Sequence, residues 1–106
     1  MTRRILRNPD RKPTHPGAIL REDVLPNLDM TQAQFAEHMG VSRLTVSELL
    51  LEKRALTADM AVRLGIVLRT TPESWLRMQE ALDLFEARQR DENKVAKPIV
   101  RARAIA

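Results

Sequence analysis

Residues 32–50 constrain the fold of this chain more than any other segment, because their spacing fits two short helices joined by a tight turn. Ala36 falls where two such helices cross closely, and only a small side chain fits at that point. Gly40 falls at the end of the first helix, where a positive φ angle costs glycine the least. Ser42 then provides a good N-cap for the second helix. The pattern therefore predicts a helix, a turn and a second helix within this one segment.

The second helix of this segment has an inner side and an accessible side. Val46 and Leu49 lie three residues apart on the inner side, and Val41 fills the turn before them. The other faces are left for five side chains: Arg43, Leu44, Thr45, Ser47 and Glu48. This arrangement is typical of a helix-turn-helix, in which the second helix enters the major groove of DNA. The segment therefore predicts a DNA-binding unit.

Helical periodicity continues on both sides of this unit. Pro16 suits the first turn of a helix and Pro26 is expected to stop it, which predicts a first helix over about residues 16–25. Four further helices are expected, over about residues 31–39, 43–52, 58–68 and 71–90. Good N-cap residues stand at their starts: Asp29 or Thr31, Ser42, Thr57 and Thr71. With no strand-rich region or internal repeat in the body, the expected fold class is all-α.

Charge is distributed unevenly along the chain, whose net charge is +4. Residues 1–12 carry five basic side chains and one acidic one, and residues 88–106 carry six basic and two acidic ones. Each end is therefore at +4, and residues 13–87 are left at −4. We expect a flexible basic arm over residues 1–12, one domain over residues 13–90 and a basic tail over residues 91–106. Because the body is acidic, DNA binding requires a local basic patch.

Two interpretations of the basic ends stay open. They are either solvated, disordered tails or segments that touch phosphates or an acidic partner surface. Residues 97–105 alternate in part between polar and apolar residues, so they could add as a strand to the edge of a partner's sheet. The N-terminal arm, with Ile5 and Leu6, is an equal candidate for such a contact.

Composition excludes several classes of protein. The chain has 106 residues and no cysteine, which excludes disulfide scaffolds and cysteine zinc sites. No apolar run is long enough to span a bilayer and no signal peptide is evident, so we expect a cytoplasmic protein without membrane contact. His15 and His38 lie far apart without further metal ligands nearby, and His15 is expected to help start the first helix. We expect no metal, no cofactor and no enzyme activity.

The last predicted helix carries apolar residues on more than one face. Four of them form one stripe at helical spacing: Trp75, Met78, Leu82 and Phe85. Leu76 and Leu84 lie off that stripe, so the helix has a further apolar surface to cover. A twofold homodimer would cover this surface and would place two recognition helices about one DNA turn apart. Scattered surface residues are the alternative, but we favour the dimer because a single unit binds too little DNA to be specific.

A series of short motifs runs from residue 15 to about residue 88. It comprises His15-Pro16-Gly17, Leu20-Arg21-Glu22, Met30-Thr31-Gln32, Gly40-Val41-Ser42-Arg43, Val46-Ser47-Glu48-Leu49-Leu50, Lys53-Arg54, Asp59-Met60-Ala61, Arg63-Leu64, Pro72-Glu73, Trp75-Leu76, Gln79 and Asp83-Leu84. Together they resemble the HigA branch of the Xre-type repressors, the antitoxins of host-inhibition-of-growth modules. The opening and closing motifs narrow the resemblance from repressors in general to this branch.

The resemblance implies a five-helix, lambda-repressor-like DNA-binding domain with an extended C-terminal helix and basic tails. It also implies a dimeric antitoxin of a type II toxin–antitoxin module. Such a protein neutralises a HigB-like, RelE-related mRNA interferase by direct binding and represses the shared promoter on double-stranded operator DNA. Two alternatives remain: a stand-alone Xre-type repressor without a toxin, and an interaction module that caps a partner and binds DNA weakly.

The resemblance also assigns candidate DNA contacts. The expected base contacts are Arg43, Leu44, Thr45, Ser47 and Glu48, and the expected phosphate contacts are Thr31, Gln32, Ser42, Lys53 and Arg54. Arg43 is the strongest candidate, because a guanidinium can bind guanine O6 and N7 with two hydrogen bonds. Glu48 either accepts from cytosine N4 or is a solvated carboxylate. Lys53 and Arg54 either extend the phosphate contacts or form an ordinary polar loop.

One departure from the resemblance concerns the end of the recognition helix. Proteins similar to this chain usually have Asn-Gly before the Lys-Arg pair, whereas this chain has Leu51-Glu52. Without the glycine, either the helix runs further or Glu52 adopts a strained turn at a cost of about 1 kcal/mol. Glu52 also brings negative charge close to the expected path of the phosphates.

Overall fold

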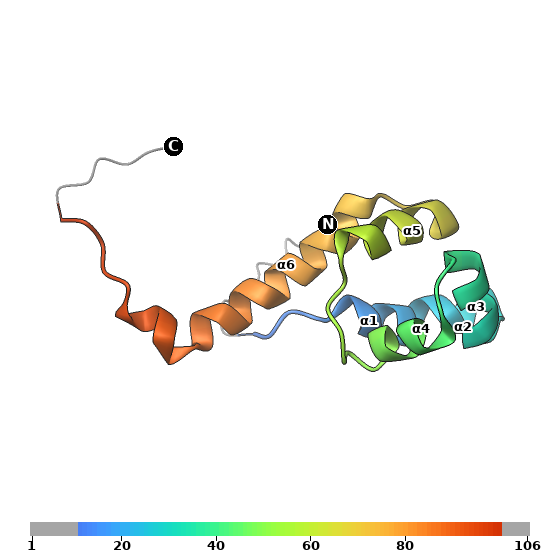
Figure 1. The fold of residues 1–106 in the computed structure, drawn as a ribbon, viewed down its shortest axis with the longest axis horizontal. Helices are drawn as coiled ribbons and strands as arrows, with labels where there is room; N and C mark the ends of the chain where they lie inside the picture. Colours follow the sequence, from blue (N-terminus) through green and yellow to red (C-terminus); the bar gives the residue numbers. More distant parts are fainter. Residues whose placement is uncertain (1–10, 101–106) are drawn as a thin grey trace, which may run out of the picture.

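The computed structural model describes residues 11–100 of the chain. The elements follow one another as α1 (Pro16–Ile19), the π-helical turn η1 (Leu20–Val24), α2 (Leu25–Leu28), α3 (Gln32–Met39), α4 (Arg43–Leu50), α5 (Ala58–Leu68), α6 (Pro72–Gln89) and the 3₁₀ turn η2 (Asp91–Val95), as Figure 1 shows. Helices are the only regular elements within residues 11–100, which confirms the all-α fold class. Most of the predicted N-terminal arm and the last six residues of the tail lie outside the described residues.

The first helix does not stop at Pro26, so that prediction is wrong. Helical backbone runs through α1, η1 and α2 to Leu28, and it ends at Asp29, whose φ angle is 53°. In η1 the Leu25 N–H donates to the Leu20 carbonyl, five residues back instead of four. Proline has no N–H, and its ring collides with the carbonyl four residues before it in a regular α-helix. The wider π turn directly before Pro26 relieves this conflict, so the helix continues past the proline.

The starts of α3, α4, α5 and α6 are set by side-chain caps that the sequence predicted. The hydroxyls of Thr31, Ser42, Thr57 and Thr71 each accept a hydrogen bond from the backbone N–H three residues later, at 3.1–3.3 Å. At α3 the Gln34 side chain also accepts from the Thr31 N–H, which completes a capping box. Each cap stabilises its helix by about 1 kcal/mol. Thr31 and Ser42 cap the two helices of the DNA-binding unit, and Thr57 caps the helix that follows this unit.

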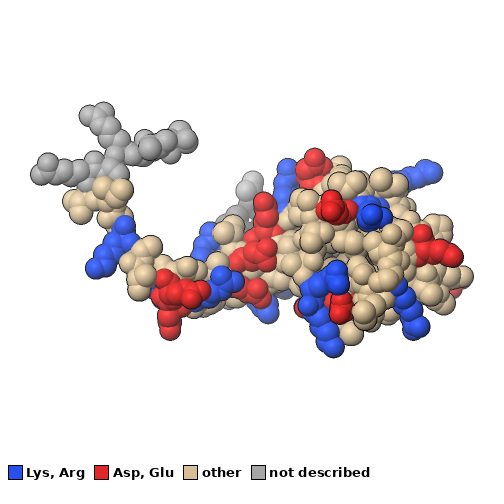
Figure 2. Space-filling view, viewed as in Figure 1, with Lys and Arg blue, Asp and Glu red and all other residues tan. Residues whose placement is uncertain are grey.

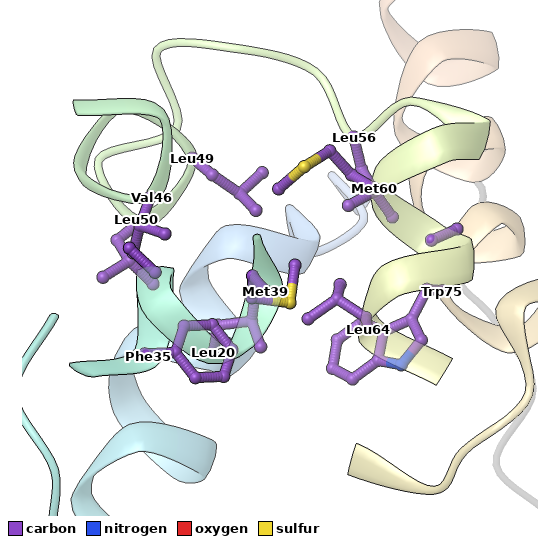
Figure 3. Packing of buried hydrophobic residues seen from close by; sticks show 12 residues of the cluster. Leu20, Phe35, Met39, Val46, Leu49, Leu50, Leu56, Met60, Leu64 and Trp75 are labelled. Carbon is purple, nitrogen blue, oxygen red and sulfur yellow. The ribbon is translucent and has the colours of Figure 1, made fainter. Parts of the chain in front are cut away.

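The core lies where α1–η1, α3, α4, α5 and the start of α6 meet (Figure 3). Its largest fully buried side chains are Leu20, Phe35, Met39, Val46, Leu49 and Leu64. Full burial of one such side chain contributes about 1.5–3 kcal/mol. Because Val46 and Leu49 belong to the predicted recognition helix, the core fixes the side of α4 that faces inward.

Helix α6 leaves the packed body, so that its C-terminal part and η2 stand apart from the other helices (Figure 1). Trp75 and Leu82 are buried, and Gln79 lies between them as a buried polar residue. The Gln79 amide accepts from the Leu56 N–H and donates to Asp83, both at 2.8 Å, so its burial leaves no polar atom unsatisfied. Leu76 packs partly against the core, while Leu84 is 51% exposed. Within residues 11–100 no helix combines the length and the apolar composition that crossing a membrane requires.

Candidate nucleic-acid interface

Helix α4 turns Val46, Leu49 and Leu50 into the core and leaves its other side accessible. The five predicted base contacts all lie on that accessible side. Arg43 and Leu44 are exposed, and Thr45, Ser47 and Glu48 are half-buried. Leu44 is 66% exposed although it is apolar, and it sits in the first turn of the helix. In a helix-turn-helix the N-terminal residues of the second helix contact base edges, so Arg43 and Leu44 lie where such contacts form.

The N-terminus of α3 forms the second part of the candidate interface. Thr31 and Gln32 are exposed there. The capping box engages the Thr31 N–H and Thr31 Oγ1, while the N–H groups of Gln32 and Ala33 lie in the first turn, where a helix supplies no partner. N–H groups at a helix N-terminus favour an anion such as a phosphate. Two backbone donors, the N–H groups of Gln32 and Ala33, thus lie beside the predicted phosphate contacts Thr31 and Gln32.

Ser42 and Thr45 are joined through their side chains. The Ser42 hydroxyl accepts from the Thr45 N–H at 3.1 Å, and the two hydroxyl oxygens lie 2.9 Å apart. Ser42 is therefore the N-cap of α4, and the predicted contact with a phosphate would be a second role of the same side chain. Since both residues remain partly accessible, a hydroxyl hydrogen is still available for DNA.

Glu48 and Arg54 form an ion pair that the sequence did not predict. Arg54 donates from Nη2 at 2.6 Å and from Nε at 3.2 Å to the same Glu48 oxygen. The pair joins a predicted base contact to a predicted phosphate contact, and each charge compensates the other. Lys53, by contrast, is exposed and has no acidic partner at ion-pair distance among the described residues. The local positive charge beside α4 therefore comes first from Arg43 and Lys53.

Helix α4 ends in a Schellman motif with a glutamate where glycine is usual. The Glu52 N–H donates to the Leu49 carbonyl at 3.0 Å, and the Lys53 N–H donates to the Glu48 carbonyl at 2.8 Å. This motif requires Glu52 in the left-handed region, and its φ angle is 63°. Of the two alternatives for this residue, the strained turn is therefore the one observed, and the helix ends at Leu50 instead of continuing to residue 52.

Arg21, on η1, contacts this helix end with a partly exposed side chain. Its Nη1 donates to the Leu50 carbonyl at 2.7 Å and to the Glu52 carboxylate at 3.2 Å, and its Nη2 donates to Glu22 at 2.6 Å. The hydrogen bond to Glu22, followed by that to Glu52, raises the pKa of Arg21 above its ordinary value. Both hydrogen bonds thus favour the charged guanidinium, the form that arginine keeps in proteins. No role was predicted for Arg21 from the sequence, where the missing glycine at residue 52 indicated only a longer helix or a strained turn.

The His15-Pro16-Gly17 motif holds the same end of α4. His15 Nδ1 accepts from the Gly17 N–H at 2.8 Å, which confirms that His15 starts the first helix, and Nε2 lies 3.1 Å from the Arg54 carbonyl. Because Nδ1 accepts, Nε2 carries the hydrogen and donates to Arg54. A Cβ atom on Gly17 would lie only 1.9 Å from the Leu49 carbonyl oxygen. Only glycine lets α1 approach α4 this closely.

Arg63 holds the turn between α3 and α4. Gly40 has a φ angle of 71°, and its N–H donates to Glu37 while the Val41 N–H donates to Ala36. Arg63 on α5 donates from Nη1 to the Met39 carbonyl at 2.8 Å and to the Gly40 carbonyl at 3.2 Å. The sequence predicted Gly40, but it gave Arg63 no role. The turn of the two-helix unit and the C-terminal end of α4 are thus both held by arginines from other helical elements.

Basic and acidic side chains are mixed on the body, and the face seen in Figure 2 has no uninterrupted basic patch. This agrees with the negative charge of residues 13–87. Within residues 11–100, His, Asp and Glu side chains do not gather in the groups of three that a metal site requires. The arrangement offers a helix with accessible polar side chains and backbone donors for phosphate.

The fold and this site define a helix-turn-helix DNA-binding domain. A helix-turn-helix family model matches residues 20–76. The chain is 40% identical over 96 residues to Antitoxin HigA-1 of Vibrio cholerae, a match that covers 89% of this chain and 90% of that protein. The chain belongs to the helix-turn-helix family, in its HigA-type antitoxin branch, which is not a class of enzymes.

Two solved structures are similar over most of the chain. One is the antitoxin GraA in complex with its operator, with a TM-score of 0.77 and 39% identity, covering 91% of this chain and 99% of that one. Another is the Pseudomonas aeruginosa antitoxin HigA with the higBA promoter, with a TM-score of 0.75 and 33% identity, covering 84% of this chain and 100% of that one.

Proposed function

We propose that this chain is an antitoxin that represses its own operon by binding operator DNA through α4, and that neutralises a HigB-like mRNA interferase by direct binding. The observation that carries the DNA-binding part is α4 itself. It presents Arg43 and Leu44 at its accessible N-terminal end, on a two-helix unit whose turn and far end are both held by other helices. The operator complexes of two similar antitoxins support this use of the fold.

In this proposal the contacts divide between bases and phosphates. Arg43 binds a guanine edge and Leu44 packs against a thymine methyl group. Thr45, Ser47 and Glu48 complete the base contacts, and Thr31, Gln32, Ser42, Lys53 and Arg54 contact phosphates. Glu48 reaches DNA as a carboxylate already bound by Arg54, which restricts its position. An acidic body with a few local donors favours specific contacts over general attraction to DNA.

The proposed assembly is a homodimer that uses α6. Leu84 is the stronger of the two predicted interface residues, since half of its surface is exposed while Leu76 is partly engaged in its own core. A twofold dimer would present two copies of α4 to one face of DNA, about one helical turn apart. The division into an arm (residues 1–12), a domain (13–90) and a tail (91–106) also stays a prediction.

One experiment tests the antitoxin role. The small open reading frame beside this gene is expressed with and without this chain, and growth and co-purification are followed. Growth arrest that this chain relieves, together with a stable complex, is the expected result. Without arrest or a complex, the toxin part of the proposal is wrong, and the stand-alone repressor is the remaining function. Binding to the promoter fragment of the same operon, against a fragment of scrambled sequence, tests the repressor part separately.

A further inference from the structure

The C-terminal end of α4 depends on another element for one of its hydrogen bonds. The last four carbonyls of the helix all have a donor. Those of Ser47, Glu48 and Leu49 accept from the N–H groups of Leu51, Lys53 and Glu52, which follow them in the chain. The Leu50 carbonyl alone accepts from a distant residue, Arg21, at 2.7 Å. A carbonyl at a helix end that lacks a backbone partner is thus satisfied by a side chain from another helical element.

The same guanidinium also holds the residue that closes the helix. Glu52 lies in the left-handed region, where residues other than glycine are strained. Its carboxylate accepts a hydrogen bond from Arg21 Nη1 at 3.2 Å. This bond connects the strained residue to η1. Lys53 and Arg54 follow directly, and Arg54 reaches back to Glu48 on α4. The path of the chain at Glu52 therefore decides where both predicted phosphate contacts lie.

We propose that Arg21 is a positioning residue for DNA recognition: by holding the Leu50 carbonyl and the Glu52 carboxylate, it stabilises a left-handed turn that is formed without a glycine. This inference rests on the proposed DNA-binding function. Arg21 acts through α4 and the following loop and not by touching DNA, because Glu22 and Glu52 already surround its guanidinium with two negative charges.

The test is a double-mutant cycle between Arg21→Met and Glu52→Gly, with operator affinity as the measurement. Methionine keeps most of the aliphatic stem and removes the donors. R21M is expected to weaken operator binding about tenfold, because the donor to the Leu50 carbonyl and the Glu52 carboxylate is lost. In the E52G background the same change is expected to cost less, about threefold, because glycine adopts the left-handed turn without help and only the Leu50 carbonyl still loses its donor.

Controls separate positioning from charge. Arg90→Met removes an equal charge at an exposed position directly after α6, and its effect on operator binding measures the general electrostatic loss. Binding to non-operator DNA of equal length should be affected equally by R21M and R90M. A merely structural role of Arg21 would lower the free energy of unfolding without this selective loss and without rescue by E52G. If R21M does not fold, Arg21→Lys replaces it in the cycle.

Two results would overturn the proposal: an R21M loss that is the same in both backgrounds, or one no larger than that of R90M. Hydrogen exchange of the Glu52 and Lys53 amides, which donate to the Leu49 and Glu48 carbonyls, gives a readout in the free protein that does not require DNA. R21M is expected to speed this exchange and E52G to restore its protection, and unchanged exchange in R21M would also contradict the proposal. If the wild-type chain does not bind its operator while exchange behaves as expected, the proposed function fails and the contact of Arg21 with this helix end stands.

Discussion

Glu48 and Arg54 form an ion pair across the end of the recognition helix, with Arg54 Nη2 2.6 Å from Glu48 Oε1. Both residues were expected to contact DNA, one at a base and the other at a phosphate. Because the two side chains are paired, each must either leave the other to contact DNA or contact DNA while the ion pair stays formed. Arg54 is half-exposed, so the pair contributes little to stability and its main consequence is for the charge that DNA meets.

Glu48→Gln is therefore expected to tighten binding to non-operator DNA. The change removes a negative charge and releases the Arg54 guanidinium, so one more cation is available for phosphates. The slope of log affinity against log salt should steepen by about one unit. Fluorescence anisotropy over a salt series measures it, with Glu92→Gln at an exposed position on η2 as the matched control. A slope equal to that of E92Q would show that the pair does not restrain Arg54.

Arg43→Ala is expected to weaken operator binding by about 1–3 kcal/mol and to relax preference at one base pair. The reason is that a guanidinium at the start of α4 can bind a guanine edge with two hydrogen bonds. Affinities for an operator series substituted one base pair at a time measure the effect. Arg69→Ala, which also removes an exposed arginine, is the control for charge alone. An R43A protein with an unchanged profile over the series would remove Arg43 from the base contacts.

The two glycines at the recognition helix should respond differently to alanine. At Gly17 the new Cβ meets the Leu49 backbone oxygen at 1.9 Å, so main chain must move, and the expected loss of unfolding free energy is about 3 kcal/mol or more. At Gly40 the nearest atom is the end of the Arg63 side chain, at 2.8 Å, which can move aside. The positive φ angle remains, and Gly40→Ala should cost about 1 kcal/mol. Urea unfolding of both variants measures the loss of unfolding free energy in each. A G40A protein that is less stable than G17A would contradict the prediction.

His15 is expected to stabilise the fold through two separable hydrogen bonds. His15→Ala loses the cap of α1 and the donor to the Arg54 carbonyl, whereas the Asn oxygen in His15→Asn can still accept from the Gly17 N–H. H15N should therefore recover about 1 kcal/mol of the stability that H15A loses. Chemical denaturation of the two variants measures the difference. Equal stability of H15N and H15A would mean that the cap contributes nothing.

The features that the sequence predicted correctly depend on near neighbours. Ser42, Thr57 and Thr71 cap helices through N–H groups three residues away, and Gly40 relieves a turn at its own position. These interactions are local in the chain, so residue type and spacing are enough to find them.

The features that the sequence missed depend on distant residues or on a choice between backbones. Arg21 and Arg63 act on carbonyls of other helices, and no spacing rule relates an arginine to a carbonyl 29 or 24 residues away. Pro26 was expected to end a helix, because the rule for proline assumes a regular α-helix before it. Here the π turn η1 precedes the proline, so the assumption does not hold. Nothing in the local sequence distinguishes a regular α-helix from a π turn at this position.

Leu84 provides the test of the dimer. Leu84→Lys places a charge on the exposed apolar position of α6, and a buried charge in an interface is costly unless it is paired. If α6 forms the interface, light scattering should show a shift from dimer to monomer at low micromolar protein. Operator affinity should fall at the same time, because two linked recognition helices bind far more tightly than one. Val95→Lys, at an exposed apolar position on η2, is the matched control and should leave the mass unchanged. A dimer that persists in L84K would exclude Leu84 from the interface, and a wild-type monomer that binds its operator with full specificity would remove the dimer from the proposed function.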